Sequence, residues 1–320
     1  MNLWKLSNEI IKGERLKKED DLSFLLEADL DELTSAADNI RKNLNGDTVD
    51  LCAIINGKSG KCGENCRYCA QSIHHNTNCE IYDFLDSDTI FEEAKNNSEE
   101  GVNRFAIVTS GKSLTGDDFE KALQIYKKMS EELPIKLCAS LGFLNEEQLK
   151  RLYAVGVRNY HDNIETSRRF FSHICTTHSF EEKIETIKLA QSIGFNVCSG
   201  GIIGMGETWQ DRIDMAFTLF ELGITSIPIN VLMAIPGTPL ENQPTLGREE
   251  ILRTIAIFKF INPDADIRLA GGRKLLPDNG RDAFLSGISS TITGNMLTTT
   301  GSTIQKDKNM LTMMGRTIIS

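Results

Sequence analysis

The chain has 320 residues, of which 35 are basic and 45 acidic, giving a formal net charge of -10. A charge of this sign argues against nucleic-acid binding through a basic surface. The apolar fraction of 40% is typical of a globular protein, and no apolar run approaches the roughly 18 residues that span a bilayer. The opening residues, MNLWKLSNEI, lack the apolar stretch of a signal peptide, so we expect a cytoplasmic protein without a membrane partner.

The predicted elements begin with a helical N-terminal cap over residues 1–48, where leucines recur at near-helical spacing. From Leu51 onward, a short apolar run, a turn and an amphipathic stretch repeat. Strands are expected at residues 51–55, 104–110, 135–141, 157–163, 195–201, 225–231, 266–270 and 290–294. Helices between them are expected at residues 117–133, 146–156, 180–194, 208–223 and 248–261. Eight such units predict an α/β fold, a (β/α)8 TIM-type barrel over residues 49–320, with a doubly wound open sheet as the alternative.

The loop after the first expected strand is long and contains three closely spaced cysteines. Cys62, Cys66 and Cys69 form the pattern C-x3-C-x2-C. The eight cysteines of the chain are too few for a small disulfide scaffold, so thiols or metal ligands are expected. Thiolates select zinc, copper(I) or iron–sulfur clusters. The segment lacks the two separated C-x2-C pairs of a common zinc site. Three thiolates on a four-iron cubane would leave one iron open for catalysis. The alternative is a zinc ion completed by Cys79, His74 or His75.

The string KCGENCRYCAQS, placed after the first strand of an expected barrel, resembles the radical S-adenosylmethionine superfamily. The resemblance implies that Cys62, Cys66 and Cys69 are catalytic ligands of a 4Fe-4S cluster, whose open iron chelates S-adenosylmethionine. An electron from the cluster would release a 5'-deoxyadenosyl radical, which takes hydrogen from an unactivated C–H bond. The reaction also requires an electron donor, such as a flavodoxin or a ferredoxin.

Five further segments resemble the biotin synthase family in order, spacing and content. They are YHDNIETS (160–167), VCSGGIIGMGET (197–208), SIPINVLMAIPGTPL (226–240), IRLAGGR (267–273) and MLTTTGS (296–302). This resemblance implies a homodimeric enzyme that inserts sulfur between C6 and C9 of dethiobiotin, the last step of biotin biosynthesis. Two S-adenosylmethionine molecules would be consumed, with sulfur drawn from an auxiliary iron–sulfur cluster. The alternatives are a related barrel enzyme, of the hydrogenase-maturation or methylornithine-forming type, and a non-catalytic zinc-binding module.

Two other cysteines, Cys138 and Cys198, lie on the third and fifth expected strands. Side chains from alternate strands of such a barrel share interior layers, so these two thiols can meet inside. Taken alone, each is more typical of a small buried hydrophobe. The family resemblance implies instead that both bind the auxiliary cluster, with Arg268 of the seventh strand beside it. An anionic cluster would offset the cost of burying the guanidinium.

One position departs from the usual family pattern. The family's third auxiliary cysteine aligns with Ala106, which cannot bind iron. Cys52 of the first strand belongs to the same alternate set as Cys138 and Cys198, whereas Cys175 lies in the loop after the fourth strand. With Cys52, three thiolates would support a four-iron auxiliary cluster carrying an extra sulfide, in place of a 2Fe-2S cluster. Resemblance to anaerobe-type biotin synthases points in the same direction.

The resemblance also assigns cofactor and substrate contacts. S-adenosylmethionine is expected at Tyr68, Asn163, Glu165, Gly200, Gly201 and Gly204. The ureido ring of dethiobiotin is expected at His161, Asn163 and Asn230. Two of these positions differ from the usual family residues, which are aspartate in place of Glu165 and asparagine in place of His161. The glycines are also typical of ordinary strand-to-helix turns.

Overall fold

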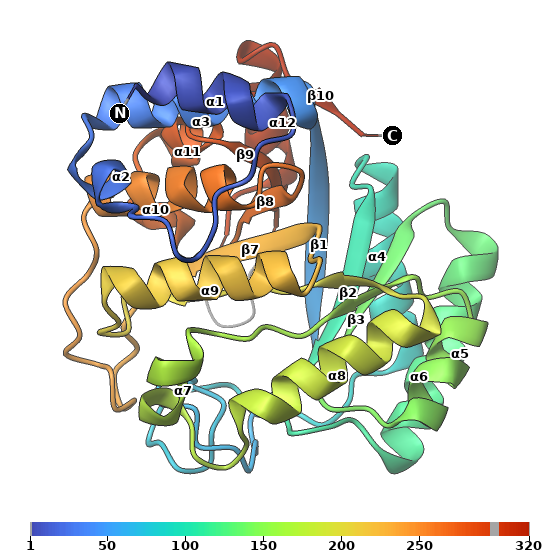
Figure 1. Ribbon diagram of the computed structural model, residues 1–320. Helices are drawn as coiled ribbons and strands as arrows, with labels where there is room; N and C mark the ends of the chain where they lie inside the picture. The colour runs from blue at the N-terminus through green and yellow to red at the C-terminus, as the bar shows by residue number, and fades with distance from the viewer. Residues whose placement is uncertain (1, 295–300, 320) are drawn as a thin grey trace.

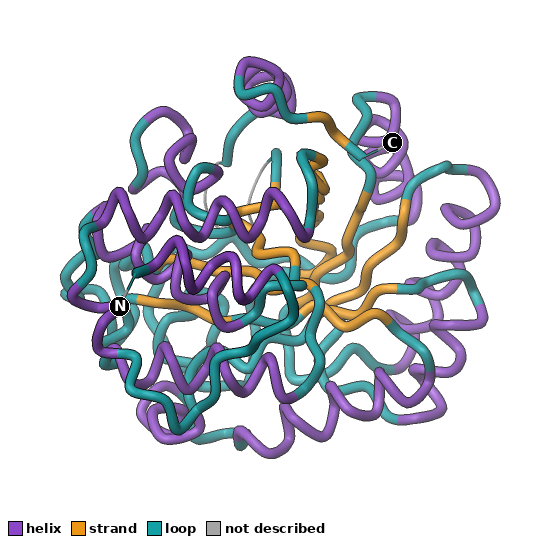
Figure 2. Tube along the Cα trace, turned by 45° about the horizontal axis from the view of Figure 1, so that its top comes forward, coloured by secondary structure: helices purple, strands orange, loops and turns teal. Residues whose placement is uncertain are grey.

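The protein is a closed barrel of parallel strands surrounded by helices (Figures 1 and 2). The computed structural model describes residues 2–294 and 301–319. The strands in barrel order are β1 (Thr48–Lys58), β2 (Arg104–Thr109), β3 (Lys136–Ser140), β4 (Asn159–His161), β5 (Asn196–Cys198), β7 (Ser226–Val231), β8 (Asp266–Leu269) and β9 (Ile288–Ile292). Because β9 also pairs with β1, the sheet has no open edge. The predicted barrel is therefore confirmed, and the open-sheet alternative is wrong.

The fifth barrel strand is interrupted. Its second piece, β6 (Gly201–Ile203), pairs with β7, as β5 does. A side chain at Gly200 would place its Cβ 1.9 Å from the backbone oxygen of Pro228, so β7 approaches too closely for any other residue at this position. The break brings the loop after β4 next to β6, since Ile202 donates a backbone hydrogen bond to Glu165 at 2.8 Å.

The helices cover the outside of the barrel, because each presents an apolar stripe to the sheet. Those along the barrel are α4 (Ser87–Glu99), α5 (Gly116–Glu132), α6 (Glu146–Ala154), α7 (Arg168–Ile174), α8 (Phe180–Ile193), α9 (Trp209–Glu221) and α10 (Arg248–Ile261). The chain ends with two short 3-10 turns (Arg273–Leu275 and Asp278–Gly280), α11 (Arg281–Phe284), α12 (Ile304–Met313) and β10 (Thr317–Ile318). Capping boxes fix the starts of α6, α8 and α9, as the Ser/Thr/Asn-x-x-acid/amide pattern at each start requires. None of the described helices is long and apolar enough to cross a membrane.

The N-terminal extension consists of α1 (Leu3–Ile11), α2 (Ser23–Glu27) and α3 (Leu30–Leu44). Helix α3 packs between α1 and α10, and its buried apolar residues belong to the same core as those of the barrel. Figure 1 shows these helices at the end of the barrel where β1 begins, opposite the loop that follows β1. The division at residue 48 stays a prediction, since the two parts share one core.

Candidate active site

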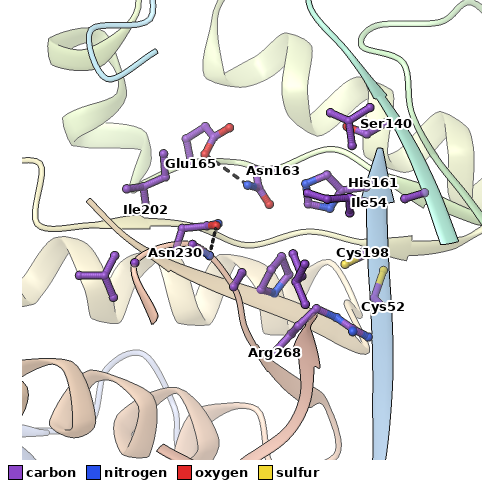
Figure 3. Close-up of a pocket in the computed structure, with 18 of the residues that line it drawn as sticks. Cys52, Ile54, Ser140, His161, Asn163, Glu165, Cys198, Ile202, Asn230 and Arg268 are labelled. Atoms are coloured by element: carbon purple, nitrogen blue, oxygen red, sulfur yellow. Dashed lines mark hydrogen bonds between the residues drawn. The ribbon is translucent and has the colours of Figure 1, made fainter. Parts of the chain in front are cut away.

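A cavity of about 380 Å³ extends from the barrel interior to the loops that follow β4, β7 and β8. Predicted site residues that line it are Cys52, Tyr68, Cys138, His161, Asn163, Glu165, Cys198, Asn230 and Arg268. Figure 3 shows two ends, with Cys52, Cys198 and Arg268 at one and Glu165 and Asn230 at the other. The volume suits a small organic ligand together with part of a cofactor.

The interior end of the cavity contains three buried thiols from alternate barrel strands. They belong to Cys52 on β1, Cys138 on β3 and Cys198 on β5. Among the described residues, these three sulfur atoms do not form a group within 4.8 Å of one another, so they are too widely spaced to hold one ion together. Ala106 lines the same cavity and pairs in register with Cys138. Cys175 lies elsewhere, beside Cys66.

Two buried arginines and an aspartate surround these thiols. Asp50 accepts a hydrogen bond from Arg104 at 2.7 Å and lies 3.3 Å from Arg268. Burial opposes ionisation of Asp50, but the two guanidinium groups outweigh it and lower the pKa to about 2. Arg104 Nε is buried without a hydrogen-bond partner in the described chain, which leaves a donor for an anion, whereas Arg268 Nη2 is the atom that contacts Asp50. Sequence reasoning missed Arg104 and Asp50, although Arg104 shares its strand face with Ala106.

Cys198 and His161 are register partners on neighbouring strands inside the barrel. Burial disfavours the charged form of both side chains, but their mutual hydrogen bond outweighs it. The bond lowers the pKa of Cys198 to about 6 and raises that of His161. Ser226 donates a further hydrogen bond to the Cys198 sulfur at 3.3 Å. Burial raises the pKa of Cys52 to about 11 and also raises that of Cys138. His161, predicted at the ureido ring, is therefore in direct contact with a thiol.

The outer end of the cavity is built around Glu165, which has a left-handed φ of 68° although it is not a glycine. Burial raises the pKa of this carboxyl, while Lys183 and a hydrogen bond from Tyr68 act in the opposite direction. Asn163 donates to Glu165 at 3.4 Å and accepts from the backbone of Gly200 at 3.0 Å. These contacts bring together four of the residues predicted to bind the cofactor.

Asn230 is oriented by the backbone on both sides. Its amide donates to the oxygen of Gly201 at 3.2 Å and accepts from the nitrogen of Gly271 at 2.9 Å. A Cβ at Gly201 would lie 2.3 Å from the backbone oxygen of Glu165, and Gly204 has a φ of +92°. Contacts within the protein therefore account for these glycines, and their predicted contact with a cofactor stays a prediction.

The cysteine loop lies beyond β1. Cys62 is buried, whereas Cys66 and Cys69 are partly exposed, and the Cys69 backbone donates to Cys66 at 3.0 Å. Burial raises the pKa of Cys69 to about 11. Within the described residues, no combination of these cysteines with Cys79, His74 or His75 forms a compact metal site. The rings of both histidines instead contact backbone oxygens of the loop at 3.0 Å, which argues against the zinc alternative.

Comparison with known proteins decides the family. The Radical SAM superfamily matches residues 58–219, and the Biotin and Thiamin Synthesis associated domain matches residues 228–317. A protein named biotin synthase from Alkaliphilus metalliredigens (strain QYMF) is 58% identical over 98% of this chain and 99% of its own. The chain belongs to the biotin synthase family. A second biotin synthase, from Clostridium beijerinckii, is also 58% identical, with the same coverage of each chain.

Solved structures agree with the barrel fold of this biotin synthase family member. A methylornithine synthase has a TM-score of 0.84 at 19% identity, covering 98% of this chain and 97% of its own. HydG, a maturase of the [FeFe]-hydrogenase, has a TM-score of 0.82 at 16% identity, covering 99% and 75%. At such low identity these two structures show the fold alone. The segment predicted at residues 296–302 lies mostly outside the described residues.

Proposed function

We propose that the protein is a biotin synthase, which inserts sulfur between C6 and C9 of dethiobiotin at the expense of S-adenosylmethionine. The observation that carries the proposal is 58% identity to biotin synthases over nearly the whole chain. Two sets of free cysteines agree with it, one in the loop after β1 and the other inside the barrel. We further propose a cytoplasmic homodimer that receives electrons from a flavodoxin or a ferredoxin.

The cysteine loop is the proposed site of the 4Fe-4S cluster. Cys62, Cys66 and Cys69 would supply its three thiolates, and their spacing is too wide for one small ion bound by all three. When bound, the cluster and S-adenosylmethionine supply a 5'-deoxyadenosyl radical that removes hydrogen from an unactivated carbon. Tyr68 follows Cys66 by two residues and reaches into the cavity, where it donates a hydrogen bond to Glu165. The loop is thereby connected to the cavity.

The interior thiols are the proposed ligands of the auxiliary cluster. Cys52, Cys138 and Cys198 would hold it, with Arg268 beside it. Its anionic charge would satisfy the unpartnered Nε donor of Arg104 and would complement the charge of Arg268. Since Ala106 supplies no thiol, we propose a four-iron cluster carrying an extra sulfide, in preference to a 2Fe-2S cluster. His161 would keep the Cys198 thiol ionised for metal binding.

The polar groups of the outer end are the proposed contacts of the organic ligands. Asn163, Glu165 and Tyr68 would bind S-adenosylmethionine, near the loop that carries the first cluster. Asn230 and Asn163 would bind the ureido ring, because an amide offers both a donor and an acceptor to a cyclic urea. The backbone contacts that hold Asn230 leave it one free N–H and one free lone pair for this purpose.

The activity is tested with anaerobically reconstituted protein, dethiobiotin, reductant and S-adenosylmethionine, with biotin measured by mass spectrometry. Biotin formation by the wild type and its loss in Cys62→Ala are expected. Protein that remains free of iron and acid-labile sulfide after reconstitution would refute the proposal. Formation of 5'-deoxyadenosine without biotin would favour a different radical reaction.

The auxiliary ligand set requires its own experiment. Mössbauer spectra of Cys52→Ala should lose the auxiliary cluster signal, while Cys79→Ala, a partly exposed cysteine outside both sets, should keep it. Adding Ala106→Cys to Cys52→Ala should restore a cluster, because position 106 lines the same cavity. A wild-type spectrum of one 4Fe-4S and one 2Fe-2S cluster, unchanged in Cys52→Ala, would contradict the four-iron assignment.

A further inference from the structure

The segment after α7 is hydrogen-bonded to the cysteine loop along its length. Arg67 donates a backbone hydrogen bond to Ile174 at 2.9 Å, and the Asn65 side chain accepts one from Thr176 at 2.9 Å. The Asn65 backbone in turn donates to the Thr177 hydroxyl at 3.1 Å. Two loops far apart in sequence are thus held in register by contacts that require no bound group.

This docking brings a second set of metal ligands together around Cys66. Its sulfur lies 3.7 Å from that of Cys175, which lies 3.3 Å from His178 Nδ1. The ligand atoms of these three residues all lie within 4.8 Å of one another. His178 Nδ1 is also hydrogen-bonded to the carboxylate of Glu64. Cys175 and His178 are both buried.

These separations match those around a single tetrahedral ion. Zinc–sulfur bonds of about 2.3 Å and zinc–nitrogen bonds of about 2.0–2.1 Å separate two sulfurs by about 3.8 Å. The same geometry separates a sulfur from a nitrogen by about 3.5 Å. The observed 3.7 Å and 3.3 Å agree with both values. The cubane set of Cys62, Cys66 and Cys69 is not grouped in this way among the described residues.

We propose that, in the cluster-free protein, Cys66, Cys175 and His178 supply three ligands to one Zn²⁺ or Fe²⁺ ion. Binding releases the protons of both thiols to solvent, so that two thiolates balance the charge of the ion, and it uses the neutral His178 ring with its proton on Nε2 and the Nδ1 lone pair on the metal. This ligand set differs from that of the zinc alternative, in which Cys79, His74 or His75 completes the loop cysteines. One consequence rests on the proposed function: because Cys66 also belongs to the cubane set, the single ion must leave its sulfur before the cubane is complete. Excess zinc would therefore slow cluster assembly.

Cobalt(II) reports this site directly, since thiolate coordination produces an intense sulfur-to-metal absorption band. The full-length apo-protein is titrated with Co²⁺ under anaerobic conditions, with a phosphine reductant. One equivalent is expected to produce the band. The band should fall by about half in Cys175→Ser, because one of two thiolates is lost. In His178→Gln the dissociation constant should rise by about tenfold or more. Cys79→Ser is the matched control and should bind like the wild type.

Variants of the other loop cysteines separate this site from the cubane. Cys62→Ser and Cys69→Ser should keep the cobalt band, although neither should assemble a complete cubane. Loss of the band in Cys62→Ser, or an undiminished band in Cys175→Ser, would overturn the proposal. If the wild type assembles a cubane but shows no cobalt band, the ion site fails while the proposed function stands. If cobalt binds but no iron–sulfur cluster can be assembled, the proposed function fails while the ion site stands.

Discussion

Lys259 provides a quantitative test of how the N-terminal extension is attached to the barrel. The residue lies on α10 and is fully buried, and its ammonium group donates to Ala265 at 3.0 Å and to the side chain of Asn45, which follows α3. Within the described residues it forms no ion pair with a carboxylate. Burial accordingly lowers its pKa to about 7.

The lowered pKa fixes the sign of a pH effect on stability. An unfolded lysine has a pKa of about 10.4, so between pH 7 and 10 the unfolded chain binds more protons than the folded one. The free energy of unfolding contributed by Lys259 therefore rises with pH across this window. It is highest above pH 10.4 and is lost as the pH falls to 7. At about 1.36 kcal/mol per unit of pKa, the cost of burial is about 4 kcal/mol at pH 7 and about 1 kcal/mol at pH 9.5.

The assay is urea unfolding at pH 7 and pH 9.5, followed by tryptophan fluorescence. Other buried groups also titrate in this range; the raised pKa of Cys52, for example, has the opposite effect on stability. Their contributions cancel in the difference between the wild type and Lys259→Met. That difference should shift by about 3 kcal/mol in favour of the wild type as the pH rises. Lys150→Met removes an exposed lysine and should give a flat difference. A shift below about 1 kcal/mol for Lys259→Met would refute the reasoning.

Three further substitutions test the site. In urea unfolding, Asp50→Asn should lower the free energy of unfolding by about 3–5 kcal/mol, because two buried guanidinium groups lose their counter-ion. The control Glu146→Gln removes a carboxylate from an exposed ion pair and should lower the free energy of unfolding by less than about 0.5 kcal/mol. Gly201→Ala should cost about 3 kcal/mol in thermal unfolding, since the new methyl group lies 2.3 Å from a backbone oxygen, and Gly63→Ala, with open space, should be neutral. If the protein has the proposed function, Asn230→Ala should raise KM for dethiobiotin by about 10–100-fold. An unchanged KM would exclude Asn230 from the substrate site.

The barrel was predictable because its strands are short apolar runs that alternate with amphipathic helices, a period that the sequence displays directly. The break between β5 and β6 was not, since no change of hydrophobic pattern marks it. It depends on the approach of β7 to Gly200, which is a tertiary contact. Helix α7, with only seven residues, is too short for its periodicity to separate it from the surrounding loop.

The odd or even position of a strand in the barrel explains which parts of the site were predictable. Cys52, Cys138 and Cys198 lie on alternate strands, and the structure brings all three to one cavity, as the parity of the strands requires. The alternation of strands cannot show how two loops meet above the strands. The contact of Cys175 with Cys66 therefore had no sequence signal, and the sequence left Cys175 as a second candidate, after Cys52, for the missing ligand.

The barrel interior itself argues that this cavity is occupied in the working protein. Barrels of this kind are normally filled by layers of branched apolar side chains. Here the layer around Cys52 contains Arg104 and Arg268, which share the carboxylate of Asp50, and Arg104 Nε lacks a hydrogen bond in the described chain. Such donors are costly to bury. A purely structural core would gain stability by replacing them with apolar residues of similar volume, so their presence supports the proposal that an anionic group binds here.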